Sequence, residues 1–307
     1  MLVPVPEMLE IGRSALDALT TSRDPPATRR RSDQPDRMLP SALMPPFRTG
    51  ATSFVYPASW AANVERLAGR VEDIELLFFA PQGPDGLPDP AELQRLVELR
   101  DRHALTYSIH TPLSASLASE DDARRAAGVA EVLRVVDATR CLSPSAYVLH
   151  VYWGDAEHGP RPSDDEAFRQ RAARSLRQII AHGLAPELLC VEYLDYDLDL
   201  LAPVIEGLEL SVALDVGHLL RDGRDWAAIL ARYLPRTRLV QWHGTQPGGR
   251  DHQSLEHVPR EVARALVEQL TAANWDGVLT LEVFEEQAFE RSLALLSQLQ
   301  QEITCRA

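Results

Sequence analysis

The chain has 307 residues and a formal net charge of −14, with 45% hydrophobic and 25% charged residues. These proportions are those of an ordinary globular protein, and the acidic balance argues against a nucleic-acid partner, whose phosphates need neutralising. Without an apolar run of about 18 residues, we expect no membrane span. All 31 basic residues are arginine. Chemistry that needs a lysine amine, such as a Schiff base, is therefore excluded.

The first 48 residues differ in composition from the rest. They are rich in proline, surround the basic run 29–31 and contain few large apolar side chains. Such a stretch buries too little apolar surface to order itself, so we expect a disordered N-terminal extension over residues 1–48. The start carries acids and lacks the apolar core of a signal peptide, and the three cysteines are unevenly spread. Both features favour a cytoplasmic protein.

From Gly50 onward, strand-like and helix-like segments alternate. Strand-like apolar runs occur at 51–56, 72–79, 105–110, 145–151, 187–193, 208–215, 237–243 and 277–283. Helical spacing occurs at 59–69, 90–103, 129–136, 168–180, 198–206, 226–233, 257–274 and 285–302. Eight such pairs predict an α/β fold, a closed (β/α)₈ TIM barrel over residues 49–307, with an open doubly wound sheet as the alternative.

Acids and imidazoles recur at the ends of the predicted strands and in the loops that follow. The series is His110, His150, Glu192, Asp215, His218, His243, Asp251, His252 and Glu282. Active sites of TIM barrels lie at the carboxyl ends of the strands, and these side chains are ligands of Zn²⁺ and Mn²⁺. The pattern therefore predicts a centre for one to three divalent metal ions.

Asp215 and His218 are the most specific local element. Asp215 ends a strand, and Gly217 predicts a tight turn that returns His218 to the same rim. The alternative is that Asp215 is an N-cap of the following helix. His243 is followed by a glycine-rich loop that returns Asp251 and His252.

Two further acids, Glu192 and Glu282, lie within apolar runs. An inward carboxylate is costly to bury unless a cation or a proton neutralises it, although pairing with an arginine is an alternative. We expect both to bind metal and to act as the catalytic carboxylates, orienting the attacking water.

Substrate contacts are predicted from aromatic and basic residues near the same rim. Tyr56, Trp153 and Trp242 are expected to line a pocket, with ordinary packing as the alternative. Arg250, together with Arg221 and Arg224, follows the rim strands and is a candidate for holding a phosphate, with an ordinary surface arginine as the alternative.

Residues 50–304 resemble the xylose-isomerase-like barrel superfamily, which also contains the endonuclease IV enzymes. Glu192, Asp215, His243 and Glu282 match the recurring ligand set of that superfamily. The wider endonuclease-like set is matched by His110, His150, His218, Asp251 and His252. In endonuclease IV the last acid and histidine are usually separated by one residue, whereas here they are adjacent. This departure leaves open whether the centre holds three ions or fewer.

The segments TSFVYP, VEDIELLFF, LTYSIHTPL, WHGTQPGGRDHQSL and LTLEVF resemble the cobamide-remodelling phosphodiesterases of this superfamily. The resemblance implies hydrolysis of a phosphoester in the nucleotide loop of a corrinoid such as cobalamin. The implied products are a cobinamide phosphate and the lower-ligand riboside. Three alternatives remain: a sugar isomerase or epimerase with one metal ion, an abasic-site nuclease, and a binding module that does not alter a corrinoid.

Overall fold

The computed structural model describes residues 45–78, 86–152, 164–193, 197–246 and 249–305. Eight parallel strands form a closed barrel in sequence order, and β8 pairs with β1. The strands are β1 Arg48–Thr52, β2 Asp73–Leu77, β3 Thr106–His110, β4 Ala146–Leu149, β5 Leu189–Glu192, β6 Ser211–Asp215, β7 Thr237–Trp242 and β8 Val278–Leu281. The predicted barrel is confirmed.

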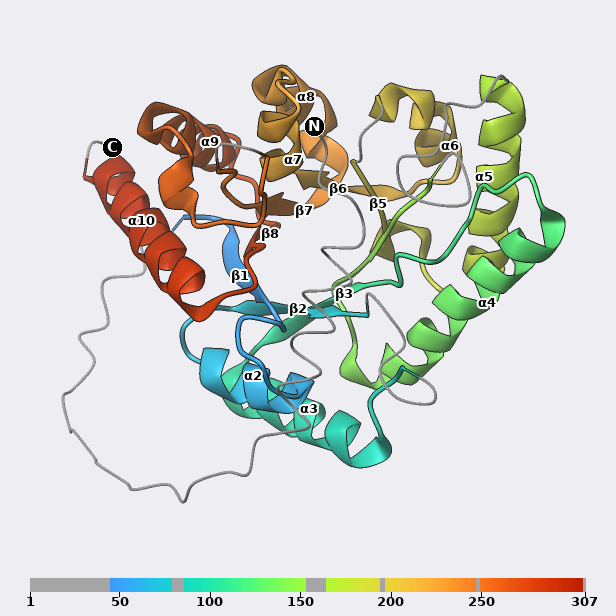
Figure 1. The fold of residues 1–307 in the computed structure, drawn as a ribbon, viewed down its shortest axis with the longest axis horizontal. Coiled ribbons are helices and arrows are strands. Elements are labelled where there is room, and N and C mark those ends of the chain that lie inside the picture. The colour runs from blue at the N-terminus through green and yellow to red at the C-terminus, as the bar shows by residue number, and fades with distance from the viewer. Residues whose placement is uncertain (1–44, 79–85, 153–163, 194–196, 247–248, 306–307) are drawn as a thin grey trace.

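Helices surround the strands (Figure 1). They are α2 Trp60–Leu67, α3 Pro90–His103, α4 Asp122–Thr139, α5 Asp165–Ala181, α6 Ala202–Gly207, α7 Val216–Arg221, α8 Trp226–Tyr233, α9 Arg260–Ala272 and α10 Glu286–Thr304. Short 3₁₀ segments occur at Arg140–Leu142, Pro186–Leu188, Leu198–Leu200, Leu234–Arg236 and Leu255–His257. No helix in the described ranges is long and apolar enough to cross a membrane.

Aspartates define where many of the helices begin. Asp89, Asp121, Asp164 and Asp225 each accept a hydrogen bond from a backbone N–H in the first turn of the helix that follows. These N–H groups have no partner within the helix, so a capping carboxylate stabilises each start, typically by about 1 kcal/mol. The caps therefore determine the residue at which each of these helices begins.

Side chains alternate between the barrel interior and the helical layer. The interior contains a compact cluster of small and medium apolar residues: Ala146, Val148, Cys190, Ala213, Leu239 and Val278. The intervening strand residues, such as Val240 and Trp242, join the larger core between barrel and helices. Because successive strand side chains face opposite ways, this pattern fixes which polar residues face inward.

The barrel starts slightly earlier than the predicted domain boundary. Arg48 is the first residue of β1, and Phe47 is buried against Trp275, with ring centroids 6.1 Å apart. Residues 1–44 of the predicted extension lie outside the described residues, so its disorder remains a prediction.

Candidate metal centre

The acids and imidazoles predicted as ligands lie at one end of the barrel. His110, Glu192 and Asp215 are the last residues of β3, β5 and β6, while His150, His243 and Glu282 follow β4, β7 and β8 directly. All six are buried. His218 lies on α7, and Asp251 and His252 lie in the loop after β7. The structure thus brings all nine predicted ligands to the carboxyl-end rim, where a barrel places its chemistry.

His243 Nδ1 lies 3.2 Å from the Gly244 carbonyl and accepts from the His252 N–H at 3.1 Å, so these contacts do not single out one tautomer of His243. Two other histidines present Nε2 to the rim. The Nδ1 atoms of His110 and His252 lie 2.9 and 3.2 Å from the backbone carbonyls of Thr111 and Glu282. A carbonyl only accepts, so Nδ1–H donates to it and the neutral ring keeps its lone pair on Nε2. This is the arrangement by which backbone carbonyls orient metal-binding histidines.

The Nε2 atoms meet carboxylates. His110 Nε2 and His150 Nε2 lie 3.1 and 2.9 Å from the same Glu192 oxygen, Oε2. His150 Nδ1 meanwhile contacts the Tyr152 hydroxyl. For His110, both ring nitrogens then face acceptors. That requires either an imidazolium or a cation shared between the ring and the carboxylate.

Several buried ligand atoms lack hydrogen bonds. Among the described residues, Asp215 Oδ2, His243 Nε2, His252 Nε2 and Glu282 Oε2 have no hydrogen-bond partner. His218 Nδ1 lies 2.9 Å from Asp215 Oδ2, but the two are not aligned as a hydrogen bond. Buried polar atoms are rarely left unpaired in native proteins. The orphaned atoms are of the kinds that bind Zn²⁺ or Mn²⁺, so the residues fit a metal centre.

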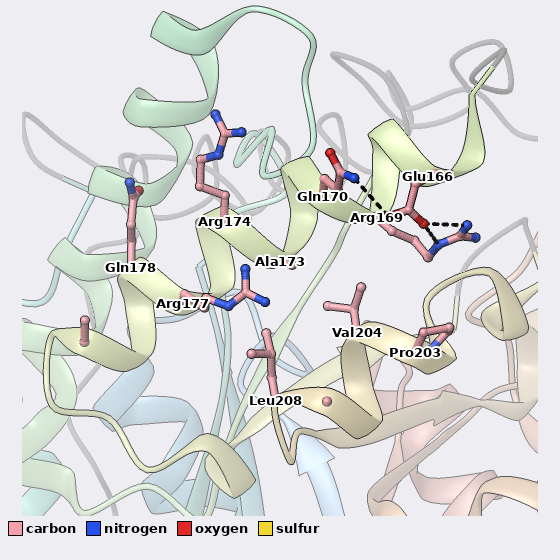
Figure 2. Close-up of a pocket in the computed structure, with 12 residues that line it drawn as sticks. Glu166, Arg169, Gln170, Ala173, Arg174, Arg177, Gln178, Pro203, Val204 and Leu208 are labelled. Carbon is pink, nitrogen blue, oxygen red and sulfur yellow. Dashed lines mark hydrogen bonds and ion pairs between the residues drawn. The ribbon is translucent and has the colours of Figure 1, made fainter.

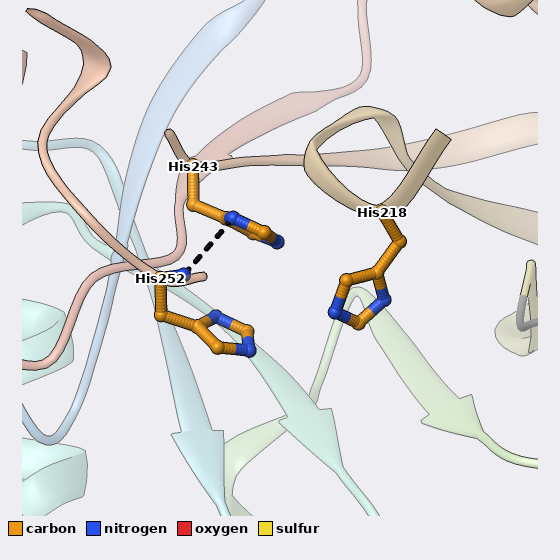
Figure 3. A group of neighbouring side chains, drawn as sticks. All are labelled: His218, His243 and His252. Atoms are coloured by element: carbon orange, nitrogen blue, oxygen red, sulfur yellow. Dashed lines mark hydrogen bonds between the residues drawn. The ribbon is translucent and has the colours of Figure 1, made fainter. Parts of the chain in front are cut away.

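Four groups of three ligands are close enough to share an ion. In each group, one ligand atom per residue lies within 4.8 Å of the others. The groups are His110–His150–Glu192, Glu192–Asp215–His218, Asp215–His243–Glu282 and His218–His243–His252. Figure 3 shows the last of these, with the His218 ring facing His243 and His252, whose rings are tilted by 35° with centroids 4.3 Å apart.

The buried carboxyl groups of the rim differ in how far neighbouring histidines balance their charge. Burial alone would raise the pKa of Glu192 and of Asp215, but adjacent histidines outweigh it and lower both. Burial and the charges of Asp215, Glu75 and Glu192 instead raise the pKa of Glu282 well above its usual value. Burial, followed by the proximity of His243, lowers the pKa of His252 to about 3. The rim therefore holds more buried acid than its histidines neutralise.

Asp215 fulfils both interpretations of its sequence position. Its Oδ1 accepts a hydrogen bond of 2.9 Å from the His218 N–H and so caps α7, while Oδ2 faces the other ligands. Gly217 does not form the tight turn predicted for it, since it lies within α7. A Cβ there would lie 2.4 Å from the His243 ring. The glycine is needed as space for His243.

The adjacent Asp251 and His252 both reach the rim because the backbone of His252 has a left-handed conformation. His252 has φ 51°, a conformation that costs a non-glycine residue about 1–2 kcal/mol. Its N–H lies 3.1 Å from His243 Nδ1. Asp251 Oδ2 lies 3.5 Å from His218 Nε2, and Asp251 Oδ1 lies 3.9 Å from His252 Nε2. Adjacent residues of an extended chain would face opposite ways.

Glu75, on β2, was missed by the sequence reasoning. It is fully buried; its Oε1 accepts a hydrogen bond of 3.2 Å from Gln241 Nε2, and its Oε2 has no partner within the described ranges. Burial and the nearby Glu192 raise its pKa well above the usual value. The signal was present, because Glu75 is an acid inside an apolar run, like Glu192 and Glu282.

The residues predicted to contact the substrate have other contacts in the structure or lie outside the described residues. Trp242 is buried in the core between barrel and helices, because its neighbour His243 faces the barrel axis, and its pocket role stays a prediction. The Tyr56 ring packs under Arg66, 3.5 Å from the guanidinium. Arg250 is exposed and paired with Glu285 at 3.5 Å. Trp153 lies outside the described residues.

A groove of about 640 Å³ lies away from this rim, between α5 and α6. Figure 2 shows Arg174 and Arg177 along α5 above Val204 and Leu208 of the opposite wall. Its lining includes none of the nine candidate ligands. The groove belongs to the helical exterior, so the chemistry of this chain is assigned to the rim.

Comparisons with known proteins agree with this architecture. The model of the xylose isomerase-like TIM barrel family matches residues 68–299. A D-tagatose 3-epimerase-like protein, 19% identical, covers 85% of this chain and 99% of its own, with a TM-score of 0.68. Endonuclease IV from Thermus thermophilus, 18% identical, covers 83% and 99%, with a TM-score of 0.60.

The IOLI protein, whose structure holds a zinc atom, is 9% identical and covers 85% and 99%, with a TM-score of 0.63. No curated protein matches this sequence significantly. At such identities the structural likeness establishes a shared fold and leaves the reaction to be argued from the site.

Proposed function

Because this chain belongs to the xylose isomerase-like TIM barrel family, we propose that its rim is a divalent-metal centre and that the protein is a phosphodiesterase. The observation that carries the proposal is the set of Nε2 and carboxylate oxygen atoms that are buried together without hydrogen-bond partners in the described chain, with the His252 ring oriented by the Glu282 carbonyl. The proposed ligands are His110, His150, Glu192, Asp215, His218, His243, Asp251, His252 and Glu282.

The number of ligands supports more than one ion. A single Zn²⁺ takes about four ligands, whereas eight of the nine candidate residues, all but Asp251, form four overlapping groups here. Glu192 belongs to two of these groups, and so does Asp215. Their two oxygens suit them to bridge neighbouring ions. Two or three ions are therefore the expected content, and Zn²⁺ or Mn²⁺ fits the mixture of imidazole and carboxylate.

Bound divalent ions would lower the pKa of a water and polarise the phosphoryl oxygen. The chain's own residues supply the rest. Glu192 and Glu282 orient the water, and the unpaired Glu282 Oε2 is placed to accept its proton. The water oxygen forms a bond to phosphorus, the bond from phosphorus to the riboside oxygen breaks, and that oxygen takes up a proton. Atoms and charges balance as a simple hydrolysis.

The proposed substrate is a cobamide, cleaved in its nucleotide loop to cobinamide phosphate and the lower-ligand riboside. Support comes from the segments TSFVYP and VEDIELLFF and from the adjacent Asp251–His252 pair. The net charge of −14 weighs against the DNA substrate of an abasic-site nuclease. We place the reaction in the cytoplasm, which suits the free thiols of Cys141, Cys190 and Cys305.

The test is to incubate the purified protein with cobalamin and Zn²⁺ or Mn²⁺ and to separate the products by chromatography. We expect cobinamide phosphate and the riboside, both absent with Asp215→Ala. If neither metal yields cobinamide phosphate, the cobamide substrate is wrong.

A sugar epimerase is the second candidate. The group Asp215–His243–Glu282, with Glu192 nearby, would suffice for one ion and two proton-transferring carboxylates. Metal content separates the two: about one ion per chain favours epimerisation, and two or three favour phosphoester hydrolysis. An abasic-site nuclease would instead show salt-sensitive binding to DNA.

A further inference from the structure

Arg221, the last residue of α7, connects two loops of the rim. Its NH1 donates to Asp251 Oδ2 at 2.7 Å, and its Nε donates to Asp222 Oδ1 at 2.8 Å. Its NH2 lies 3.3 Å from Asp222 Oδ2. The side chain is only 13% exposed. Arg221 therefore joins the turn after β6, which carries His218, to the loop after β7.

Those contacts leave little of the guanidinium for a substrate phosphate. Two carboxylates already occupy Nε, NH1 and NH2, and a planar fork binds a carboxylate best through two parallel bonds. Arg221 is thus poorly placed for the phosphate binding expected from the sequence. Its geometry suits a clamp, by which we mean that it holds the Asp251 side chain in one orientation.

The clamp acts on Asp251, a candidate ligand whose backbone is not held by a strand or helix of the barrel. Asp251 lies in a loop, beyond any strand, and precedes the left-handed His252. Arg221 binds its Oδ2, which leaves Oδ1 on the side of His252 Nε2, 3.9 Å away. Without that bond, rotation of the Asp251 side chain would be restrained only by the more distant contact with His218 Nε2, at 3.5 Å.

We propose that Arg221 is a positioning residue: it fixes Asp251 so that Oδ1 serves the ion bound beside His218 and His252. The proposal rests on the metal centre proposed above. Within the described residues, the side-chain contacts of Arg221 go to Asp222 and Asp251 and not to the groups His110–His150–Glu192 and Asp215–His243–Glu282, so its removal should affect one ion and spare the others. Orienting residues of this kind typically contribute about 10–100-fold to metal affinity.

Arg224 offers a matched control on the same turn. It is an arginine paired with a single acid, Asp197, at 3.5 Å, and its side chain is 34% exposed. Arg221→Ala, Arg221→Lys and Arg224→Ala would be loaded with Zn²⁺ alone, dialysed, and analysed for ions per chain and for the dissociation constant of each. Thermal unfolding of each variant reports its folding.

We expect Arg221→Ala to bind one ion at least about tenfold more weakly while the remaining ions stay bound. Arg221→Lys should be intermediate, because an ammonium keeps the charge but cannot hold Asp251 and both Asp222 oxygens. Arg224→Ala should match the native chain in ion content and in the dissociation constant of each ion. With Co²⁺ substituted for Zn²⁺, only the Arg221 variants should change the visible absorption spectrum.

Native ion content and affinities in Arg221→Ala would overturn the proposal, as would equal losses in Arg224→Ala. If Arg221→Ala does not fold, Arg221→Lys carries the test, and native affinity in it overturns the clamp. A native chain that binds no zinc overturns the metal centre together with the clamp. A native chain that binds zinc but leaves cobalamin intact overturns the cobamide substrate alone.

Discussion

The two ends of the barrel differ in how they satisfy a buried carboxyl group, as two residues of β2 show. Asp73 and Glu75 are two residues apart, face the same way and are both fully buried. Asp73, at the amino end, receives hydrogen bonds from Ser108 at 2.8 Å and Thr106 at 2.5 Å. Glu75, toward the carboxyl end, receives one from Gln241, and its Oε2 has no partner within the described part of the chain.

The amino end of the barrel therefore contributes to stability, whereas the carboxyl end is arranged to bind a ligand. At the amino end, hydroxyl groups and the nearby Arg48, whose NH1 lies 4.0 Å from Asp73 Oδ2, satisfy the buried acid. At the carboxyl end, Glu282 Oε2 has no hydrogen-bond partner within the described chain, and Asp215 Oδ2 has none beyond its 2.9 Å approach to His218 Nδ1. Leaving a buried polar group unmatched typically costs about 1–3 kcal/mol. That cost is recovered when a ligand, here a cation, supplies the missing partner.

The largest expected effect is at the carboxyl end. Asp215→Ala and His243→Ala should each abolish turnover of cobalamin and reduce bound zinc, because both residues face the orphaned cluster. The fold should remain, since other contacts hold β6 and β7 in the barrel. Product chromatography and circular dichroism measure the two properties. Unchanged hydrolysis in both variants would contradict the metal-centred mechanism.

The amino end should respond in the opposite way. Asp73→Ala leaves the Ser108 hydroxyl without its acceptor, removes one partner of Thr106 and leaves a cavity, so we expect a loss of about 2–4 kcal/mol in the free energy of unfolding. Bound zinc per folded chain should be unchanged. Urea denaturation and metal analysis provide the measurement. Loss of zinc from folded Asp73→Ala would show that the two ends are not independent.

Metal binding should release protons at neutral pH. Burial and then neighbouring negative charges raise the pKa of Glu282, which therefore holds its proton in the metal-free protein. A cation reverses that charge balance and displaces the proton, so zinc affinity should fall as the pH falls. Calorimetry in buffers of different ionisation enthalpy counts the protons. Glu282→Gln, which has no proton to lose, should release fewer; equal release would contradict this assignment.

The smallest effect is expected for Glu75→Gln. Burial and then the charge of Glu192 raise the pKa of Glu75, which favours its neutral form, and an amide keeps nearly the same shape. Stability at neutral pH should change by no more than about 1 kcal/mol, and zinc should be retained. Urea denaturation and metal analysis apply again. A loss of zinc would instead make Glu75 a charged participant in the centre.

Much of the site was predictable because its signal is local. A residue that ends an apolar run in an eightfold β/α series must reach the carboxyl-end rim, which placed His110, Glu192 and Asp215 correctly. A second signal, an acid inside an apolar run, applies to Glu75 on β2 as it does to Glu282. Alternation along β7 predicts that Trp242 faces the helices when His243 faces the axis.

The sequence alone determined the barrel and the rim, because hydrophobic periodicity and strand ends are properties of neighbouring residues. Only the tertiary structure decided how rim residues pair. The left-handed backbone at His252, the space that Gly217 leaves for His243 and the link from Arg221 to Asp251 are examples. Each depends on atoms brought together from separate strands and loops, whose register and separation are set by packing of the whole barrel.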